Sequence, residues 1–186
     1  MALTLTSLSA CSMMCDSCAP CGHDYHDVTR VLLMPQGLRP KLLYTIPTFQ
    51  NPSGSVMPEP RRRRLVQLAR KFNFIILSDD VYQLLNCDGA AAAPLPMSYF
   101  DVSSLAAGAT GDTDAARGGA ISMGSFSKLL FPGLRVGWMH GRPELLEQCA
   151  ARGVIRSGGC RAHFNSGLVM AAIDSGDFAV RWFASG

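Results

Sequence analysis

Four short runs rich in apolar residues are spaced along the chain, and each predicts a β-strand. They occupy residues 41–46, 74–77, 120–123 and 135–139. Short apolar runs bounded by turn-forming residues are typical of buried strands. Pro47 and the sequence at residues 49–54 follow the first run directly and predict a turn there.

A helix is predicted between the first two strands. Apolar side chains recur there at helical spacing and form one stripe, at Leu65, Leu68, Ala69 and Phe72. Pro58, Glu59 and Pro60 suit a first turn, where a missing amide hydrogen costs nothing and an acid complements the helix dipole. A strand, a helix and a strand within about 35 residues predict a βαβ unit with parallel strands.

The later connections complete the predicted fold. Only about ten residues separate the third strand from the fourth, too few for a parallel crossover, so these two strands should pair antiparallel. Residues 86–118 predict a long loop with one turn of structure near Tyr99 and Phe100. Helices are expected over residues 143–155 and 164–173. The expected fold class is α/β, with three α/β/α layers and a mostly parallel sheet.

Composition fits one domain and excludes several functions. The chain has 186 residues, 48% of them hydrophobic, and its net charge of +3 is too weak to indicate nucleic acid or an anionic membrane as partner. No run of about 18 uncharged apolar residues predicts a membrane span. Residues 1–36 are expected to be disordered. Because residues 1–15 lack the basic region of a secretory signal, a cytoplasmic location is expected, with organellar targeting left open.

Thiols and imidazoles crowd into residues 11–26, at Cys11, Cys15, Cys18, Cys21, His23 and His26. Such side chains are zinc ligands in many proteins. One cluster of cysteines and histidines, without a strand or helix pattern beside it, is weak evidence for a metal site, so no metal site is expected here.

Polar side chains follow each of the first three predicted strands. In sequence order they are Gln50 and Asn51, then Ser78, Asp79, Asp80 and Tyr82, then Ser125, Ser127 and Lys128, with Arg135 close behind. Ligands of open α/β sheets bind outside the carboxyl ends of the strands. One site there would hold an amide, a carboxylate, a phenol, hydroxyls, an amine and a guanidinium, which suit a phosphorylated pyridine aldehyde.

Three motifs together resemble a known family. They are Asn51-Pro52-Ser53-Gly54, then Ser78-Asp79-Asp80-Val81-Tyr82, then Ser125-Phe126-Ser127-Lys128 with Pro132-Gly133-Leu134-Arg135-Val136-Gly137-Trp138. In this order and at these separations they resemble class I/II aminotransferases, which are fold-type I enzymes dependent on pyridoxal 5′-phosphate (PLP). The resemblance covers residues 37–186 as part of the large domain of that family and leaves residues 1–36 unmatched.

The resemblance implies three catalytic residues. Lys128 matches the lysine that forms an imine with the cofactor, and it would move a proton at the substrate α-carbon once an amino acid has displaced it. Asp79 matches the aspartate on the pyridine nitrogen. Tyr82 matches a donor to the ring oxygen, which tunes the imine.

The remaining matched positions are cofactor ligands. Asn51 pairs with Tyr82 on the ring oxygen, and the bond that joins it to Pro52 is cis in well-studied members. Ser125 and Arg135 match phosphate ligands, with Ser127 beside them.

The implied activity is the transfer of an amino group between an amino acid and a 2-oxo acid, in a homodimer. Two alternatives stay open. One is a PLP-dependent lyase or synthase of the same fold, acting at the β- or γ-carbon. The other is a truncated chain without catalysis, because family members are about twice this length and carry further cofactor and substrate contacts.

Several other residues are expected to serve the fold. Arg61 to Arg64 are interpreted as a solvated helix face. Asp80 is interpreted as a solvated or structural acid, and His140 and His163 as structural. Side chains expected to face a core are Leu145, Leu146, Cys149 and Val154 in one late helix, and Phe164 and Met170 in the other.

Overall fold

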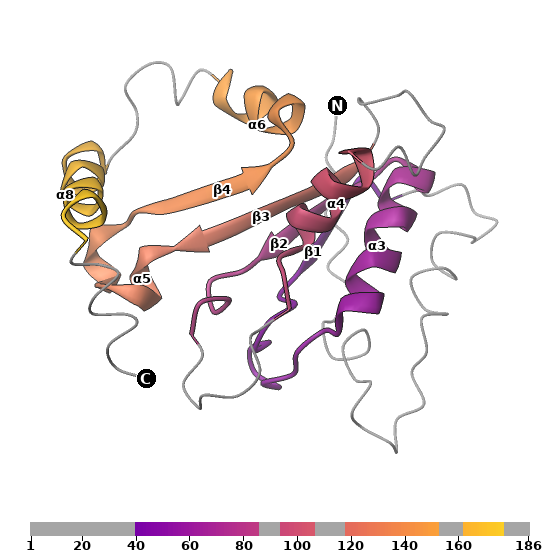
Figure 1. The fold of residues 1–186 in the computed structure, drawn as a ribbon, viewed down its shortest axis with the longest axis horizontal. Coiled ribbons are helices and arrows are strands. Elements are labelled where there is room, and N and C mark those ends of the chain that lie inside the picture. Colours follow the sequence, from indigo (N-terminus) through magenta and orange to yellow (C-terminus); the bar gives the residue numbers. More distant parts are fainter. Residues whose placement is uncertain (1–39, 86–93, 107–117, 153–161, 177–186) are drawn as a thin grey trace.

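A four-stranded mixed sheet is the centre of the fold (Figure 1). The computed structural model describes residues 40–85, 94–106, 118–152 and 162–176. The strands are β1 (Leu42–Thr45), β2 (Ile75–Asp79), β3 (Gly119–Ser125) and β4 (Gly137–Gly141), in that order across the sheet. β1 with β2 and β2 with β3 pair parallel, whereas β3 with β4 pairs antiparallel. Both predicted directions and the four predicted strands are confirmed, except that the fourth begins at Gly137 rather than at residue 135.

Helices α3 (Glu59–Phe72) and α4 (Met97–Ala106) lie together on one face of this sheet (Figure 1). The apolar stripe of α3 faces the sheet as predicted, because Leu65, Leu68 and Ala69 are buried and Phe72 packs against them. The α/β class is therefore confirmed.

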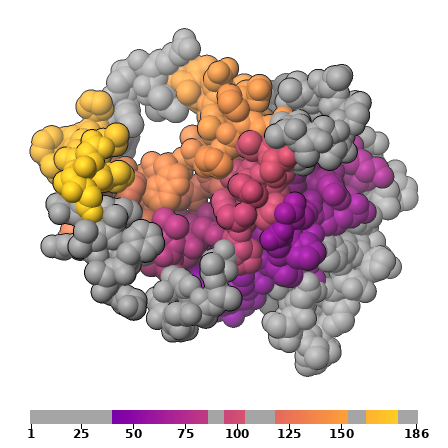
Figure 2. Space-filling view, in the orientation of Figure 1, coloured from indigo at the N-terminus to yellow at the C-terminus, as the bar shows by residue number. Residues whose placement is uncertain are grey.

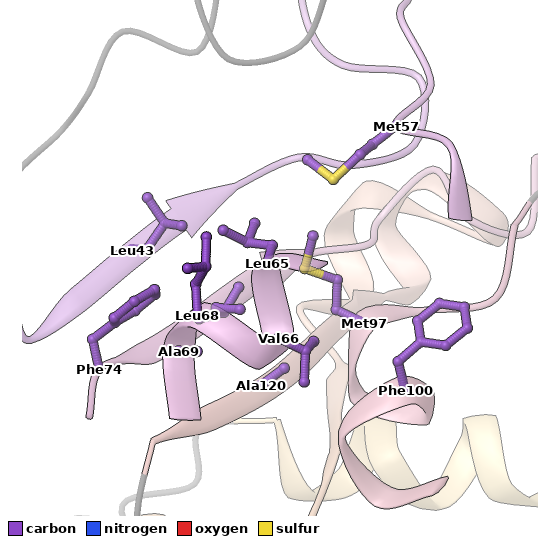
Figure 3. Close-up of a cluster of buried hydrophobic side chains, with 11 residues drawn as sticks. Leu43, Met57, Leu65, Val66, Leu68, Ala69, Phe74, Met97, Phe100 and Ala120 are labelled. Atoms are coloured by element: carbon purple, nitrogen blue, oxygen red, sulfur yellow. The ribbon is translucent and has the colours of Figure 1, made fainter. Parts of the chain in front are cut away.

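The main core fills the space between the two helices and the sheet (Figure 3). It draws on β1, α3, β2, α4 and β3, through Leu43, Met57, Leu65, Val66, Leu68, Ala69, Phe74, Ile76, Met97, Phe100 and Ala120. Because these residues come from all three parallel strands and both helices, the core fixes where strands β1 to β3 end.

Helix α4 corrects the prediction of a long loop over residues 86–118. Met97 and Phe100, three residues apart, are buried in the main core. Ser98 and Asp101 are also fully buried, and each is hydrogen-bonded to the sheet: the amide of Ser98 donates to Ser122 Oγ at 3.3 Å, and Asp101 Oδ2 accepts from the amide of Ala120 at 3.1 Å. Partners this remote in sequence leave no local helical pattern.

The second half of the described chain is less buried. It comprises α5 (Phe126–Leu129), a 3₁₀ turn (Pro132–Leu134), α6 (Pro143–Ala150) and α8 (His163–Asp174). Helix α6 ends earlier than the predicted residue 155. Leu145 faces inward as expected, whereas Leu146 and Cys149 are half-buried and Val154 lies outside the described residues.

Helix α8 contradicts the expectation that Phe164 and Met170 belong to a core. Their side chains are 77% and 57% exposed, and Val169 is the buried residue of this helix. In the space-filling view α8 lies at the opposite end of the molecule from α3 (Figure 2). Since α8 stands away from the main core, its Leu168 and Ile173 are exposed as well.

The charge run Arg61–Arg64 is only half solvated, which corrects its interpretation as a solvated face. Arg63 and Arg64 are exposed, while Arg61 and Arg62 are buried. Arg62 reaches loop oxygens that the sequence pattern does not reveal.

The cysteines and histidines of residues 11–26 lie outside the described residues, so the expectation about a metal stays a prediction. Among the helices that the structure describes, none is long and apolar enough to cross a membrane.

Candidate active site

The strand ends bring the candidate residues to one edge of the sheet. In the parallel register Thr45 pairs with Ser78 and Asp79 pairs with Met123, so β1, β2 and β3 end at the same edge. β4 begins there, since Ser125 pairs with Gly137. The segments that carry Asn51, Asp79 to Tyr82, Ser125 to Lys128, and Arg135 therefore all leave or enter the sheet at this edge.

Asp79 ends β2 and is held by a tyrosine of the neighbouring strand. The Tyr44 hydroxyl donates a hydrogen bond to Asp79 Oδ2 at 2.5 Å. Tyr44 pairs with Leu77, so Asp79 lies diagonally across on the same face, within reach of a long side chain. Oδ1 of Asp79 has no hydrogen-bond donor within the described part of the chain, and can accept one from a ligand.

The hydrogen bond to Asp79 predicts unusual titration of Tyr44. Burial, the hydrogen bond to Asp79 and the charges of Asp79 and Tyr82 raise the pKa of Tyr44 to about 12. Stability from the neutral phenol is then fully present below about pH 10 and is lost as the pH rises toward 12. We expect ultraviolet titration to show one late-ionising phenol that Tyr44→Phe removes and Asp79→Asn shifts to lower pH. An unshifted Tyr44 in Asp79→Asn would contradict the coupling.

Lys128 and Tyr82 meet at the edge although they come from different strand ends. Tyr82 lies in the turn after β2, and Lys128 lies in α5 directly after β3. The Lys128 Nζ atom is 5.9 Å from the centroid of the Tyr82 ring, within the range of a cation–π contact. Lys128 is exposed and Tyr82 half-buried, so the amine can reach a ligand.

Two hydroxyls and a guanidinium gather beside α5. Ser125 Oγ accepts a hydrogen bond from the amide of Ser127 at 3.1 Å, and Arg135 Nη1 donates to Ser127 Oγ at 3.3 Å. Arg135 has φ +52°, a left-handed conformation that non-glycine residues seldom adopt and that clusters at functional sites. Together these groups can donate several hydrogen bonds to an anion, the guanidinium in a fork.

The loop that carries Asn51 is braced from within. The buried Gln50 side chain donates to the Asn51 carbonyl at 2.6 Å and accepts from the amide of Ser53 at 2.9 Å. The bond between Asn51 and Pro52 is cis, as the resemblance implies, and Phe49 has φ +50°.

Asn51 itself is exposed, in the loop that follows β1. Among the described residues, the side chains of Asn51 and Tyr82 form no direct hydrogen bond. The two segments that carry them are linked by other side chains, because Thr48 Oγ1 donates to Gln83 Oε1 at 2.7 Å.

Asp80 is buried, so it is not a solvated acid, and its structural role stays a prediction. Ser78 Oγ donates to its Oδ1 at 3.0 Å. Burial raises the pKa of Asp80, while hydrogen bonds from Ser122 and Ser78 and the charge of Arg62 act in the opposite direction. The expected structural role of His140 stays a prediction; its Nδ1 lies 2.7 Å from Ser98 Oγ.

The mixed sheet, with the candidate residues gathered at the carboxyl ends of its parallel strands, belongs to the PLP-dependent aminotransferase fold, an α/β fold. The structure resembles kynurenine aminotransferase from Pyrococcus horikoshii, solved with PMP, with a TM-score of 0.66 and 30% identity; the match covers 88% of this chain and 37% of that one. It also resembles the α-aminoadipate aminotransferase LysN from Thermus thermophilus, solved with N-(5′-phosphopyridoxyl)-L-leucine. That TM-score is 0.61 with 33% identity, over 88% of this chain and 38% of that one.

The sequence comparisons agree. The family model described as aminotransferase class I and II matches residues 2–179, so the chain belongs to this family. Aromatic-amino-acid aminotransferase 1 of Thermococcus litoralis is 37% identical over 61% of this chain and 23% of its own length. A 2-aminoadipate transaminase of Thermus thermophilus is 36% identical over 69% of this chain and 29% of its own. The chain thus spans less than a third of the length of these curated relatives.

Tyr44 was not among the predicted site residues. Its contact with Asp79 follows from the register of β1 against β2, which places the tyrosine on the same face two positions away along the ladder. Thr48, Gln83 and Arg62, which connect the loops behind the site, left no signal in the pattern.

Proposed function

We propose that this chain binds PLP at the carboxyl edge of the sheet and serves amino-group transfer between an amino acid and a 2-oxo acid. The observation that carries the proposal is that three separate strand ends meet at one edge of the sheet. They bring together the Lys128 amine, the Asp79 carboxylate with one oxygen still able to accept a hydrogen bond, and the anion-binding groups around Arg135. We also propose that residues 37–186 form part of the large domain of the family, and that the whole protein acts as a homodimer.

The donor set fits the cofactor. Asp79 Oδ1 can accept a hydrogen bond from the pyridine nitrogen, while Tyr44 holds the other oxygen in place. Ser125, Ser127 and Arg135 would hold the phosphate, and Asn51 and Tyr82 would donate to the ring oxygen. When bound, PLP supplies an aldehyde that combines with amines and a ring that accepts electron density from the substrate α-carbon.

The chain's own residues would then have distinct tasks. The Lys128 amine would attach to the cofactor at rest and, when displaced by an amino acid, would take a proton from the substrate α-carbon and return it to the cofactor side. The charge of Asp79 would keep the ring nitrogen protonated. Arg135 would fix the orientation of the bound group through its phosphate.

Amino-group transfer is tested by a single half-reaction. The chain is loaded with PLP, freed of excess, and mixed with phenylalanine or 2-aminoadipate, the substrate classes that the relatives' names suggest. We expect 2-oxo acid in proportion to bound PLP, because the amino group stays on the cofactor. Chain treated with pyridoxal should give far less, since Arg135 has no phosphate to bind. A yield no higher than that of free PLP would contradict the proposal.

A further inference from the structure

Arg62 is a buried arginine in the middle of an otherwise amphipathic helix. Its side chain is fully buried, and burial lowers its pKa to about 10, against the opposing effect of the negative charge of Asp80. Burying a guanidinium is costly, and a well-packed apolar residue often serves stability as well or better. The contacts that Arg62 makes therefore need a reason beyond the packing of α3.

Those contacts reach three separate segments. Arg62 Nε donates to the Met57 carbonyl at 2.8 Å, and Nη2 donates to the Pro47 carbonyl at 2.9 Å and to Thr48 Oγ1 at 2.8 Å. Nη1 donates to the carbonyls of Pro94 and Leu95 at 3.2 and 3.0 Å. All five hydrogen bonds end on neutral oxygens of loops, so the guanidinium acts as a connector between them.

Further hydrogen bonds extend from Arg62 toward the candidate site. Thr48 Oγ1, which accepts from Arg62, donates in turn to Gln83 Oε1, and Gln83 Nε2 donates to the Pro94 carbonyl at 2.6 Å. Thr48 lies three residues before Asn51, and Gln83 directly follows Tyr82. One hydrogen-bonded network thus joins the loop that carries Asn51 to the turn that carries Tyr82, although these two side chains share no direct hydrogen bond among the described residues.

We propose that Arg62 is a positioning residue of the cofactor site, which sets the separation of the Asn51 loop and the Tyr82 turn so that both side chains can donate to the same ring oxygen. This inference rests on the proposed function. Arg62 itself lies behind the site and touches no ligand. Its effect on binding should therefore be confined to the ring oxygen, and should leave the phosphate contacts of Arg135 and Ser127 unchanged.

The test compares PLP with 3-deoxypyridoxal 5′-phosphate, which lacks the ring oxygen, by equilibrium binding. Arg62→Met should weaken PLP about tenfold, the value of one good hydrogen bond, and change the deoxy analogue less than about twofold. Arg62→Lys should restore part of the difference. The matched control is Arg64→Met, on the exposed side of the same helix, which should change neither.

Two further measurements test the positioning role of Arg62. Thr48→Val removes the bridging hydroxyl while keeping Arg62, and it should show the same selective loss even if Arg62→Met does not fold. Amide hydrogen exchange without cofactor should quicken at residues 48–50 and 82–85 in the Arg62 and Thr48 variants only. Equal losses for both ligands, or no loss, would overturn the positioning role. Wild-type chain that binds neither ligand would instead overturn the proposed function, and the inference with it.

Discussion

Lys128→Ala is expected to abolish the attachment of PLP that borohydride makes permanent. Only three lysines occur in the chain, Lys41, Lys71 and Lys128. Lys128 alone lies at the edge that carries Asp79 and Tyr82, with its amine 5.9 Å from the Tyr82 ring. A carbonyl cofactor bonds covalently only to an amine held within reach, so removing this amine should end fixation entirely. Peptide mass spectrometry after reduction measures the labelled residue directly.

Lys71→Ala is the matched control, because Lys71 lies exposed in the last turn of α3. Its replacement should leave labelling at Lys128 unchanged. Labelling that persists in Lys128→Ala at Lys41 or Lys71, to the same extent as in the wild-type chain, would show that the amine at the sheet edge is not the one the cofactor uses.

Asp101→Ala is expected to lower the free energy of unfolding by about 3–5 kcal/mol, the usual result of removing one partner of a buried ion pair. The Asp101 carboxylate is fully buried and serves two arginines, with Arg70 Nη2 at 2.7 Å from Oδ1 and Arg142 Nε at 2.8 Å from Oδ2. Asp101 also accepts a hydrogen bond from the amide of Ala120. Without it, two largely buried guanidinium groups lose their counter-charge at the junction of α3, α4 and the sheet.

Urea unfolding followed by circular dichroism measures this loss. Asp101→Asn keeps the size and one acceptor but removes the charge, so its loss should be smaller. The exposed pair of Glu59 and Arg63 provides the comparison, since Glu59→Ala should cost less than about 1 kcal/mol. A loss of that small size in Asp101→Ala would show that the buried pair does not hold α4 in place.

The sheet could be predicted because its signals are local. The strands are continuous apolar runs, and the length of each connection fixes whether neighbours run parallel or antiparallel. Helix α4 could not be predicted, because its buried Ser98 and Asp101 pack against Ser122, Arg70 and Arg142, which are distant in sequence. The burial of Arg62 could not be predicted for the same reason, because its partners are loop oxygens that only folding brings together.

The site was predictable to the extent that it follows strand ends. Asp79 and Lys128 stand at fixed offsets from apolar runs, and parallel pairing carries both to one edge. The contact of Tyr44 with Asp79 depends on the register of β1 against β2, which the sequence does not specify by itself. The exposure of Phe164 and Met170 depends on what lies next to α8, which helical periodicity does not encode.

The antiparallel return of β4 restricts how this region can change during evolution. Ser125 pairs with Gly137, and the amide of Phe126 bonds to the Val136 carbonyl, so the intervening segment is closed at its base. Trp138 packs on the Phe126 ring and lies so close to Gly124 that any added Cβ would overlap it. Inserting or deleting a single residue within β4 before Trp138 would turn that ring to the opposite face of the sheet. Sequence change within β4 is therefore confined to substitutions. Insertions and deletions must fall in the segment between Phe126 and Val136, where the pairing of Ser125 with Gly137 can be kept.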